Sequence, residues 1–94
     1  MMNLLAEQKT PSEINQEIAG RVREIRKRQG LSQSILSSKS GVSLGSLRRF
    51  EKSGEISLQS LTKLAMALNL GDEMEQLFNH IPYQSIEEVI RGQR

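Results

Sequence analysis

The side chains with the clearest chemical capacity in this 94-residue sequence are cationic, and most of them lie between positions 21 and 52. This stretch holds nine Lys and Arg residues against two acidic residues, a net charge of +7, whereas the rest of the chain carries −5. Guanidinium and ammonium groups bind phosphate, and neutralisation of phosphates underlies binding to nucleic acids. The stretch therefore predicts an anion-binding surface. Residues 71–90 contain five acidic residues and no basic one, so they are expected to face away from it.

The sequence lacks the residue patterns that catalysis and metal binding require. The sequence has no Cys, which excludes a disulfide framework, a thiolate metal site and a Cys nucleophile, and His80 is its only His. The acidic pairs at 72–73 and 87–88 fall at predicted helix starts, where carboxylates complement the helix dipole. The seven Gly residues are scattered rather than gathered into a phosphate-binding loop. We therefore expect no enzyme activity, no metal and no cofactor.

Size and hydropathy indicate one small domain. The chain is 36% apolar with three aromatic residues, which suffices for one modest core, since domains typically have about 100–150 residues. No apolar run approaches the roughly 20 residues of a membrane span, and the N-terminus lacks the pattern of a signal peptide. A cytoplasmic protein with no membrane contact is expected.

Helix signals recur along the chain and strand signals do not. The first helix begins with Thr10 as N-cap, Pro11 in the first helical position and Glu13 three residues after the cap. Gly30, Gly41, Gly54 and Gly71 are expected to end helices, and Pro82 bars continuation of another. The sequence predicts an all-α fold of five or six helices, over residues 11–29, 32–39, 43–52, 57–69, 72–79 and 85–91.

The core is predicted from apolar residues at helical spacing. One face of the first helix carries Ile14, Ile18, Val22 and Ile25. The fourth helix carries the stripe Leu58, Leu61, Leu64, Ala65 and Leu68.

The two short helices over 32–39 and 43–52 are joined by a tight turn, which is the arrangement of a helix-turn-helix. Residues of suitable size for its packing are present: Leu36 toward the core, Ser37 at the helix crossing, Gly41 and Val42 in the turn, and Leu47 and Phe50 behind the second helix. Leu44, Gly45, Arg48, Arg49 and Lys52 are left on its other faces. A helix held in this way can lie in the major groove of DNA with its N-terminal half at the base edges.

The motifs extend over roughly residues 18–70. They comprise Arg23-Glu24-Ile25-Arg26, Gly30-Leu31-Ser32-Gln33, Leu36, Gly41-Val42-Ser43, Leu47, Phe50-Glu51, Ser57-Leu58, Leu61, Leu64-Ala65 and Leu68. This pattern resembles the XRE family of helix-turn-helix regulators, which includes phage repressor and Cro proteins. The resemblance implies a repressor-like domain that binds double-stranded DNA as a homodimer.

The resemblance also implies roles for individual residues. Gln33 matches a position that contacts backbone phosphate, and Arg26 and Glu51 match a buried ion pair that joins the first helix to the third. The residues at the recognition-helix positions include Leu44 and Gly45, where the family often has hydrogen-bonding side chains. Hydrogen-bonded base contacts then fall to Ser43, Ser46, Arg48 and Arg49, and Glu55 weakens phosphate contact in the following loop. The expected DNA contacts are Ser32, Gln33, Ser43, Leu44, Gly45, Ser46, Arg48, Arg49 and Lys52.

The sequence predicts a division of the chain into three segments and leaves two alternative functions open. Residues 1–10 are expected to be a flexible arm, residues 11–70 the XRE-type DNA-binding domain, and residues 71–94 a helical extension that contacts a second copy or another protein. The first function is a sequence-specific transcriptional regulator, a repressor that inserts helix 43–52 into the major groove. The alternative is a HipB-like antitoxin, which represses its own operon and also binds a toxin protein.

Overall fold

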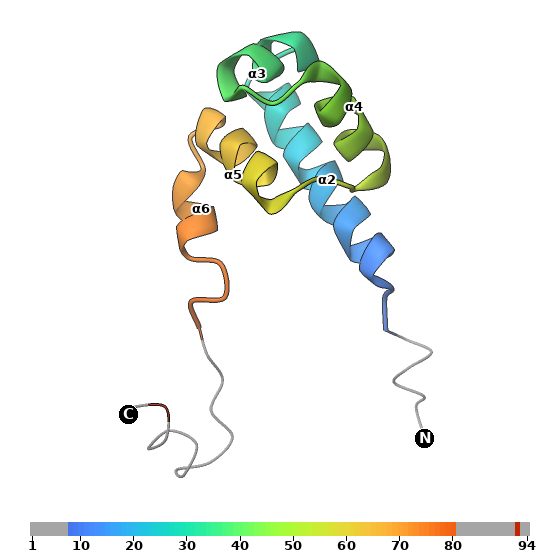
Figure 1. Cartoon of the computed structure of the whole chain (residues 1–94), viewed down its shortest axis with the longest axis vertical. Coiled ribbons are helices and arrows are strands. Elements are labelled where there is room, and N and C mark those ends of the chain that lie inside the picture. Colours follow the sequence, from blue (N-terminus) through green and yellow to red (C-terminus); the bar gives the residue numbers. More distant parts are fainter. Residues whose placement is uncertain (1–7, 81–91, 93–94) are drawn as a thin grey trace.

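The computed structural model describes residues 8–80 and residue 92, and this part of the chain contains five α-helices and no strand (Figure 1). The all-α prediction is therefore confirmed. The expected helix over 85–91 and residues 1–7 of the expected arm lie outside the described residues. None of the described helices has the length and apolar character needed to cross a membrane. The helices are α2 (Pro11–Arg28), α3 (Gln33–Ser40), α4 (Leu44–Ser53), α5 (Leu58–Ala67) and α6 (Gly71–Glu75).

Helices α2 to α5 each begin at a hydroxyl side chain that accepts a hydrogen bond from a backbone N–H of the first turn; these caps are Thr10, Ser32, Ser43 and Ser57. At α2 the cap is reciprocal, because the Glu13 carboxylate also accepts from the Thr10 N–H at 3.0 Å. The hydrogen bonds from Thr10 lower the pKa of Glu13 below its ordinary value, because they favour the ionised form. The helix starts predicted at these four positions are confirmed.

The core lies where α2, α3, α4 and α5 meet. Helix α2 packs along α4, α3 packs on both α4 and α5, and α6 packs on α5 (Figure 1). The four apolar residues predicted to hold the helix-turn-helix from within are all buried, so α3 and α4 form one rigid unit on the core. The buried apolar residues are Ala19, Leu36, Val42, Leu47, Phe50, Leu64 and Leu68.

Two residues predicted to belong to the core stripes are exposed instead. Ile14 is 45% exposed and Leu58 is 67% exposed. Both stand near the N-terminal end of their helix, beyond the point where the neighbouring helices cover the stripe. The helical spacing was correct, but the packed part of each stripe is shorter than the spacing suggests.

The chain between α5 and residue 80 also differs from the prediction. Asn69, with φ +63°, carries the left-handed turn after α5, and Gly71 begins α6 rather than ending α5. The start of α6 has no side-chain cap, although the acidic residues 72–73 fall where the sequence predicts a helix start. Helix α6 ends at Glu75 instead of residue 79, because the chain turns and Phe78 adopts φ +58°, outside the right-handed helical region.

Candidate nucleic-acid interface

The turn between α3 and α4 is held by hydrogen bonds at each of its residues. Gly41 ends α3 with φ +77°, and its N–H donates to the Ser37 carbonyl at 3.0 Å. The Ser37 hydroxyl donates to the Val42 carbonyl at 2.6 Å, and the Val42 N–H donates to the Ser40 hydroxyl at 3.1 Å. These bonds fix the angle at which α4 leaves α3.

Helix α4 presents a polar and cationic side to solvent. Leu47 and Phe50 are 0% and 1% exposed and attach its inner side to the core. Leu44 is half-buried. The residues exposed on the outer side of α4 are Gly45, Ser46, Arg48, Arg49 and Lys52.

The two serines at the start of α4 contact each other. The Ser43 hydroxyl accepts from the Ser46 N–H at 3.1 Å and donates to the Ser46 hydroxyl at 2.8 Å. The Ser46 hydroxyl keeps its own hydrogen for another acceptor, since a hydroxyl donates one bond and accepts two. Ser43 therefore serves first as a helix cap, and Ser46 is the better oriented of the two toward an outside ligand.

A buried ion pair joins α2 to α4. Arg26 Nε lies 2.7 Å from Glu51 Oε2 and Arg26 Nη2 lies 3.0 Å from Oε1, while the two side chains are only 8% and 4% exposed. The third guanidinium nitrogen, Nη1, donates to the Leu31 carbonyl at 2.8 Å. This bidentate geometry fixes the rotation of α4 about its axis, because Glu51 cannot turn away without leaving the Arg26 charge buried.

The pKa of Glu51 lies below its ordinary value. Burial alone would raise this pKa, because it disfavours the charged form. The hydrogen bonds from Arg26 and Gln33, together with the charges of Arg26 and Arg23, outweigh burial and hold the carboxylate ionised. Glu51 is thus a fixed negative charge that is paired with Arg26 and hydrogen-bonded by Gln33.

The pair extends toward the surface through Gln33, the first residue of α3. Its side-chain Nε2 donates to Glu51 Oε1 at 2.9 Å, and its Oε1 accepts from Arg48 Nε at 3.4 Å. Arg23 approaches the same carboxylate, with Nε 3.8 Å from Oε1. A shallow surface hollow lined by these side chains and Lys52 results. Gln33, the expected phosphate contact, thus has its side-chain amide engaged with Glu51 and Arg48.

One contact of the site was not anticipated from the sequence. Arg49 Nη2 lies 2.6 Å from Glu55 Oε1, and the two side chains are 69% and 62% exposed. We expected Glu55 to weaken phosphate binding by its charge, but not to pair with a residue of the recognition helix. The six-residue separation is not a helical spacing, and the pair forms because the chain reverses at Gly54, where φ is +82°. The sequence feature that could have predicted this ion pair is the acidic residue directly after the helix-ending Gly54.

The expected DNA contacts lie at the start of α3 and along the outer side of α4. The Arg48–Gln33 contact joins these two elements into a single surface. Ser32 caps α3 through its hydroxyl, which accepts from the Ile35 N–H at 3.0 Å. The N–H groups of Gln33 and Ser34 have no acceptor within the helix, so they can bind an anion together with the neighbouring cations.

The sequence matches a known protein family. The family model HTH_3, described as helix-turn-helix, matches residues 22–73, which is more than half of the chain. The matched residues run from the middle of α2 through α3, α4 and α5 into α6. No curated protein matches the sequence.

Proposed function

The chain belongs to the XRE family of helix-turn-helix regulators and is therefore a DNA-binding transcriptional regulator, and we propose that it is a repressor that inserts α4 into the major groove of its operator. The observation that supports this most strongly is the outer side of α4, which is cationic and exposed while Arg26 and Glu51 hold the helix from behind. A domain that occupies the major groove excludes other proteins from the same base pairs. Repression follows where those base pairs belong to a promoter.

The proposed contacts divide between bases and phosphates. Arg48 and Arg49 are the candidates for hydrogen bonds to base edges, and a guanidinium suits the O6 and N7 atoms of guanine. Leu44 suits a thymine methyl, Gly45 allows close approach of the helix, and the hydroxyls of Ser43 and Ser46 add short polar contacts. The proposed phosphate contacts are Ser32, Gln33 and Lys52.

The test is a gel shift on the DNA upstream of the protein's own gene, repeated at two salt concentrations, with a reporter gene under the same DNA. We expect a shift that weakens at higher salt, because phosphate neutralisation releases counterions, and lower reporter output when the protein is present. Arg49→Ala should lower the affinity by about 1–3 kcal/mol and relax the preference for one base. The absence of a shift at low salt, or a rise in reporter output, would contradict the proposal.

We further propose that the protein acts as a homodimer. Helix-turn-helix dimers place two recognition helices about 34 Å apart on successive turns of DNA, which doubles the base pairs read. This matters here, because Leu44 and Gly45 make no hydrogen bonds to bases and each α4 offers few such groups. In this arrangement residues 11–70 form the DNA-binding domain, and residues 71–94 are the proposed extension that contacts the second copy.

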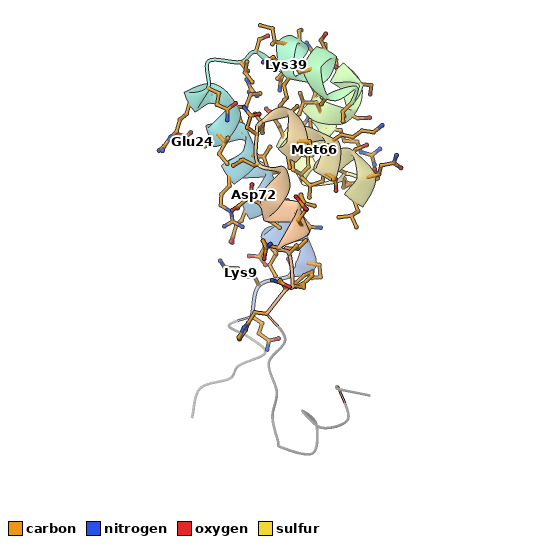
Figure 2. All side chains as sticks on the ribbon, turned by 90° about the vertical axis from the view of Figure 1, so that its left-hand side faces the viewer. Lys9, Glu24, Lys39, Met66 and Asp72 are labelled. Carbon is orange, nitrogen blue, oxygen red and sulfur yellow. The ribbon has the colours of Figure 1, made fainter. Side chains whose placement is uncertain are left out.

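An apolar groove between α5 and α6 is the proposed contact with the second copy. It is lined by Leu58, Thr62, Met66, Gly71, Met74, Glu75, Leu77 and Phe78. Four of these are large exposed apolar side chains: Leu58, Met66, Leu77 and Phe78, the last 87% exposed. A cluster of this kind marks a protein contact, whereas single exposed apolar residues are common. Glu75 is the only charged residue of the lining, so the surface that a second copy would meet here is mostly apolar. Figure 2 views the molecule from this side, with Met66 on α5 and Asp72 on α6.

Sedimentation of Phe78→Ser over a wide range of concentration tests the dimer. The matched control is Ile14→Ser, which removes an exposed apolar side chain of α2 that does not line the groove. We expect Phe78→Ser to weaken the dimer by about 1.5–3 kcal/mol for each buried ring, and the control to leave it unchanged. A wild-type chain that remains monomeric, also on operator DNA, would contradict the proposal. The groove would then favour the antitoxin alternative, in which a toxin protein covers it.

A further inference from the structure

We propose that Glu55 is a specificity-determining residue that positions Arg49 for contact with a base. The inference rests on the proposed function, because it assumes that α4 reads DNA. Its first support is the ion pair itself, in which Glu55 Oε1 lies 2.6 Å from Arg49 Nη2 on the outer side of α4. An exposed ion pair contributes little to the stability of the fold, so the main effect that we propose for this pair is to orient the Arg49 guanidinium.

The main chain that carries Glu55 is fixed relative to Arg49. The Ser53 hydroxyl donates to the Arg49 carbonyl at 2.7 Å and accepts from the Glu55 N–H at 3.2 Å. Gly54 between them has φ +82°, and a Cβ at this residue would lie 2.8 Å from the backbone carbon of Asn15 in α2. The turn thus lies directly on the backbone of α2. Glu55 projects from a rigid position, unlike a side chain on an open loop.

A carboxylate at this position favours base contact over phosphate contact by Arg49. A guanidinium has five N–H donors in a planar fork, and the contact with Glu55 engages Nη2, so other donors of the fork remain to face O6 and N7 of guanine. The same carboxylate repels phosphate oxygens from this side of Arg49. It also orders a long side chain before DNA arrives, which removes part of the ordering cost from the binding step.

Removal of the carboxylate therefore has two opposite effects on DNA binding. Without Glu55, Arg49 is free to turn toward the phosphates, and the interface gains one net positive charge. Affinity for any duplex rises or stays constant, while the preference for guanine at the Arg49 position falls. A residue that merely stabilised the fold would instead weaken binding to all sequences equally.

The chain offers a matched control in Glu24, which also forms an exposed ion pair with an arginine. Its Oε1 lies 3.1 Å from Arg28 Nε, and both residues belong to α2 rather than to α4. Figure 2 shows Glu24 projecting from α2 at the edge of the molecule. Glu24→Gln and Glu55→Gln remove the same charge from the same kind of pair. They differ in whether the pair lies on the recognition helix.

The test is selection from a randomised duplex DNA library by wild type, Glu55→Gln and Glu24→Gln, followed by sequencing of the bound DNA. We expect Glu55→Gln to reduce the guanine preference at one position of each half-site by about two- to fivefold, the range open to an exposed ion pair. Glu24→Gln should retain the wild-type preference. Equal preference in Glu55→Gln and wild type would overturn the inference. If wild type selects no sequence at all, the proposed function itself fails.

A second comparison separates positioning from direct contact. In an Arg49→Ala background, Glu55→Gln should change the selected sequence no further, because the residue through which Glu55 acts is gone. An additional loss of preference in the double variant would mean that Glu55 contacts a base itself, for example the amino group of cytosine. That result would overturn the positioning role.

Discussion

At the scale of single residues, the orientation of α4 depends on one buried carboxylate. Glu51 is 4% exposed and receives hydrogen bonds from Arg26 and Gln33, which come from two other helices. Arg26 is itself buried, so its guanidinium depends on Glu51 as counter-charge. Loss of one partner leaves the other charged and desolvated, which costs far more than the pair contributes when both are present.

Glu51→Ala should therefore lower the free energy of unfolding by about 3–5 kcal/mol, measured by urea denaturation. Glu24→Ala, which breaks the exposed pair with Arg28, should cost only about 0.5 kcal/mol or less. Similar losses in the two variants would show that the buried Arg26–Glu51 pair contributes no more to the free energy of unfolding than an exposed pair does.

The same carboxylate gives stability a defined dependence on pH. Because the pKa of Glu51 is lower in the folded protein than in the unfolded chain, its contribution is complete above the unfolded value of about 4.3. The contribution is lost as the pH falls through the lower folded pKa. The difference in thermal midpoint between wild type and Glu51→Gln should therefore be largest near neutral pH and shrink below about pH 4. A difference that stays constant from pH 7 to pH 3 would contradict this account.

At the scale of elements, two glycines in the same backbone conformation have different tasks. Gly41 after α3 and Gly54 after α4 have φ +77° and +82°. A Cβ at Gly41 would meet no atom within 4 Å, whereas a Cβ at Gly54 would meet the backbone of Asn15 and Gln16. Gly41 is needed for conformation alone, and Gly54 for conformation and for contact with α2.

The pair Gly41→Ala and Gly54→Ala separates these effects. Each variant places a Cβ in the left-handed region, at a cost of roughly 1–2 kcal/mol. Gly54→Ala must in addition move α2 away from the turn, so its thermal midpoint should fall further, by at least about 4–8 °C for each additional kcal/mol. Equal midpoints would show that the turn is not packed against α2 in solution.

Local patterns were sufficient to predict most of the helices. The caps at Thr10, Ser32, Ser43 and Ser57 are local, because each hydroxyl bonds a backbone N–H of its own helix. The buried residues of the helix-turn-helix could be predicted for a similar reason, since their spacing specifies one side of each helix.

The features missed depend on contacts between elements. Helical spacing gives the direction of Ile14 and Leu58, but not how far the neighbouring helices reach along each stripe. The contact of Gln33 with Glu51 and that of Arg49 with Glu55 each require the fold to bring the partners together. The left-handed conformation of Asn69 was missed because the nearby Gly71 is the residue expected to turn the chain, and that of Phe78 because a helix was expected over residues 72–79.

At the scale of the whole molecule, charge is distributed unevenly between residues 21–52 and α6. The stretch 21–52 carries +7, and α6 contributes Asp72, Glu73 and Glu75. Lys39 stands at one end of the molecule in Figure 2, and Asp72 lies well below it. Such a distribution orients the protein as it approaches DNA, because the acidic side is repelled while the basic side is attracted.

We propose that the outer side of α4 reads the operator, and variants that each lack two positive charges test this proposal. Fluorescence anisotropy over a series of salt concentrations compares the DNA upstream of the gene with a scrambled duplex. Arg48→Ala/Arg49→Ala removes two charges from α4, and Arg21→Ala/Arg28→Ala removes two from exposed residues of α2. We expect the α4 variant to lose the preference for the upstream duplex and the α2 variant to keep it. Equal loss in both variants, or greater loss in the α2 variant, would contradict it.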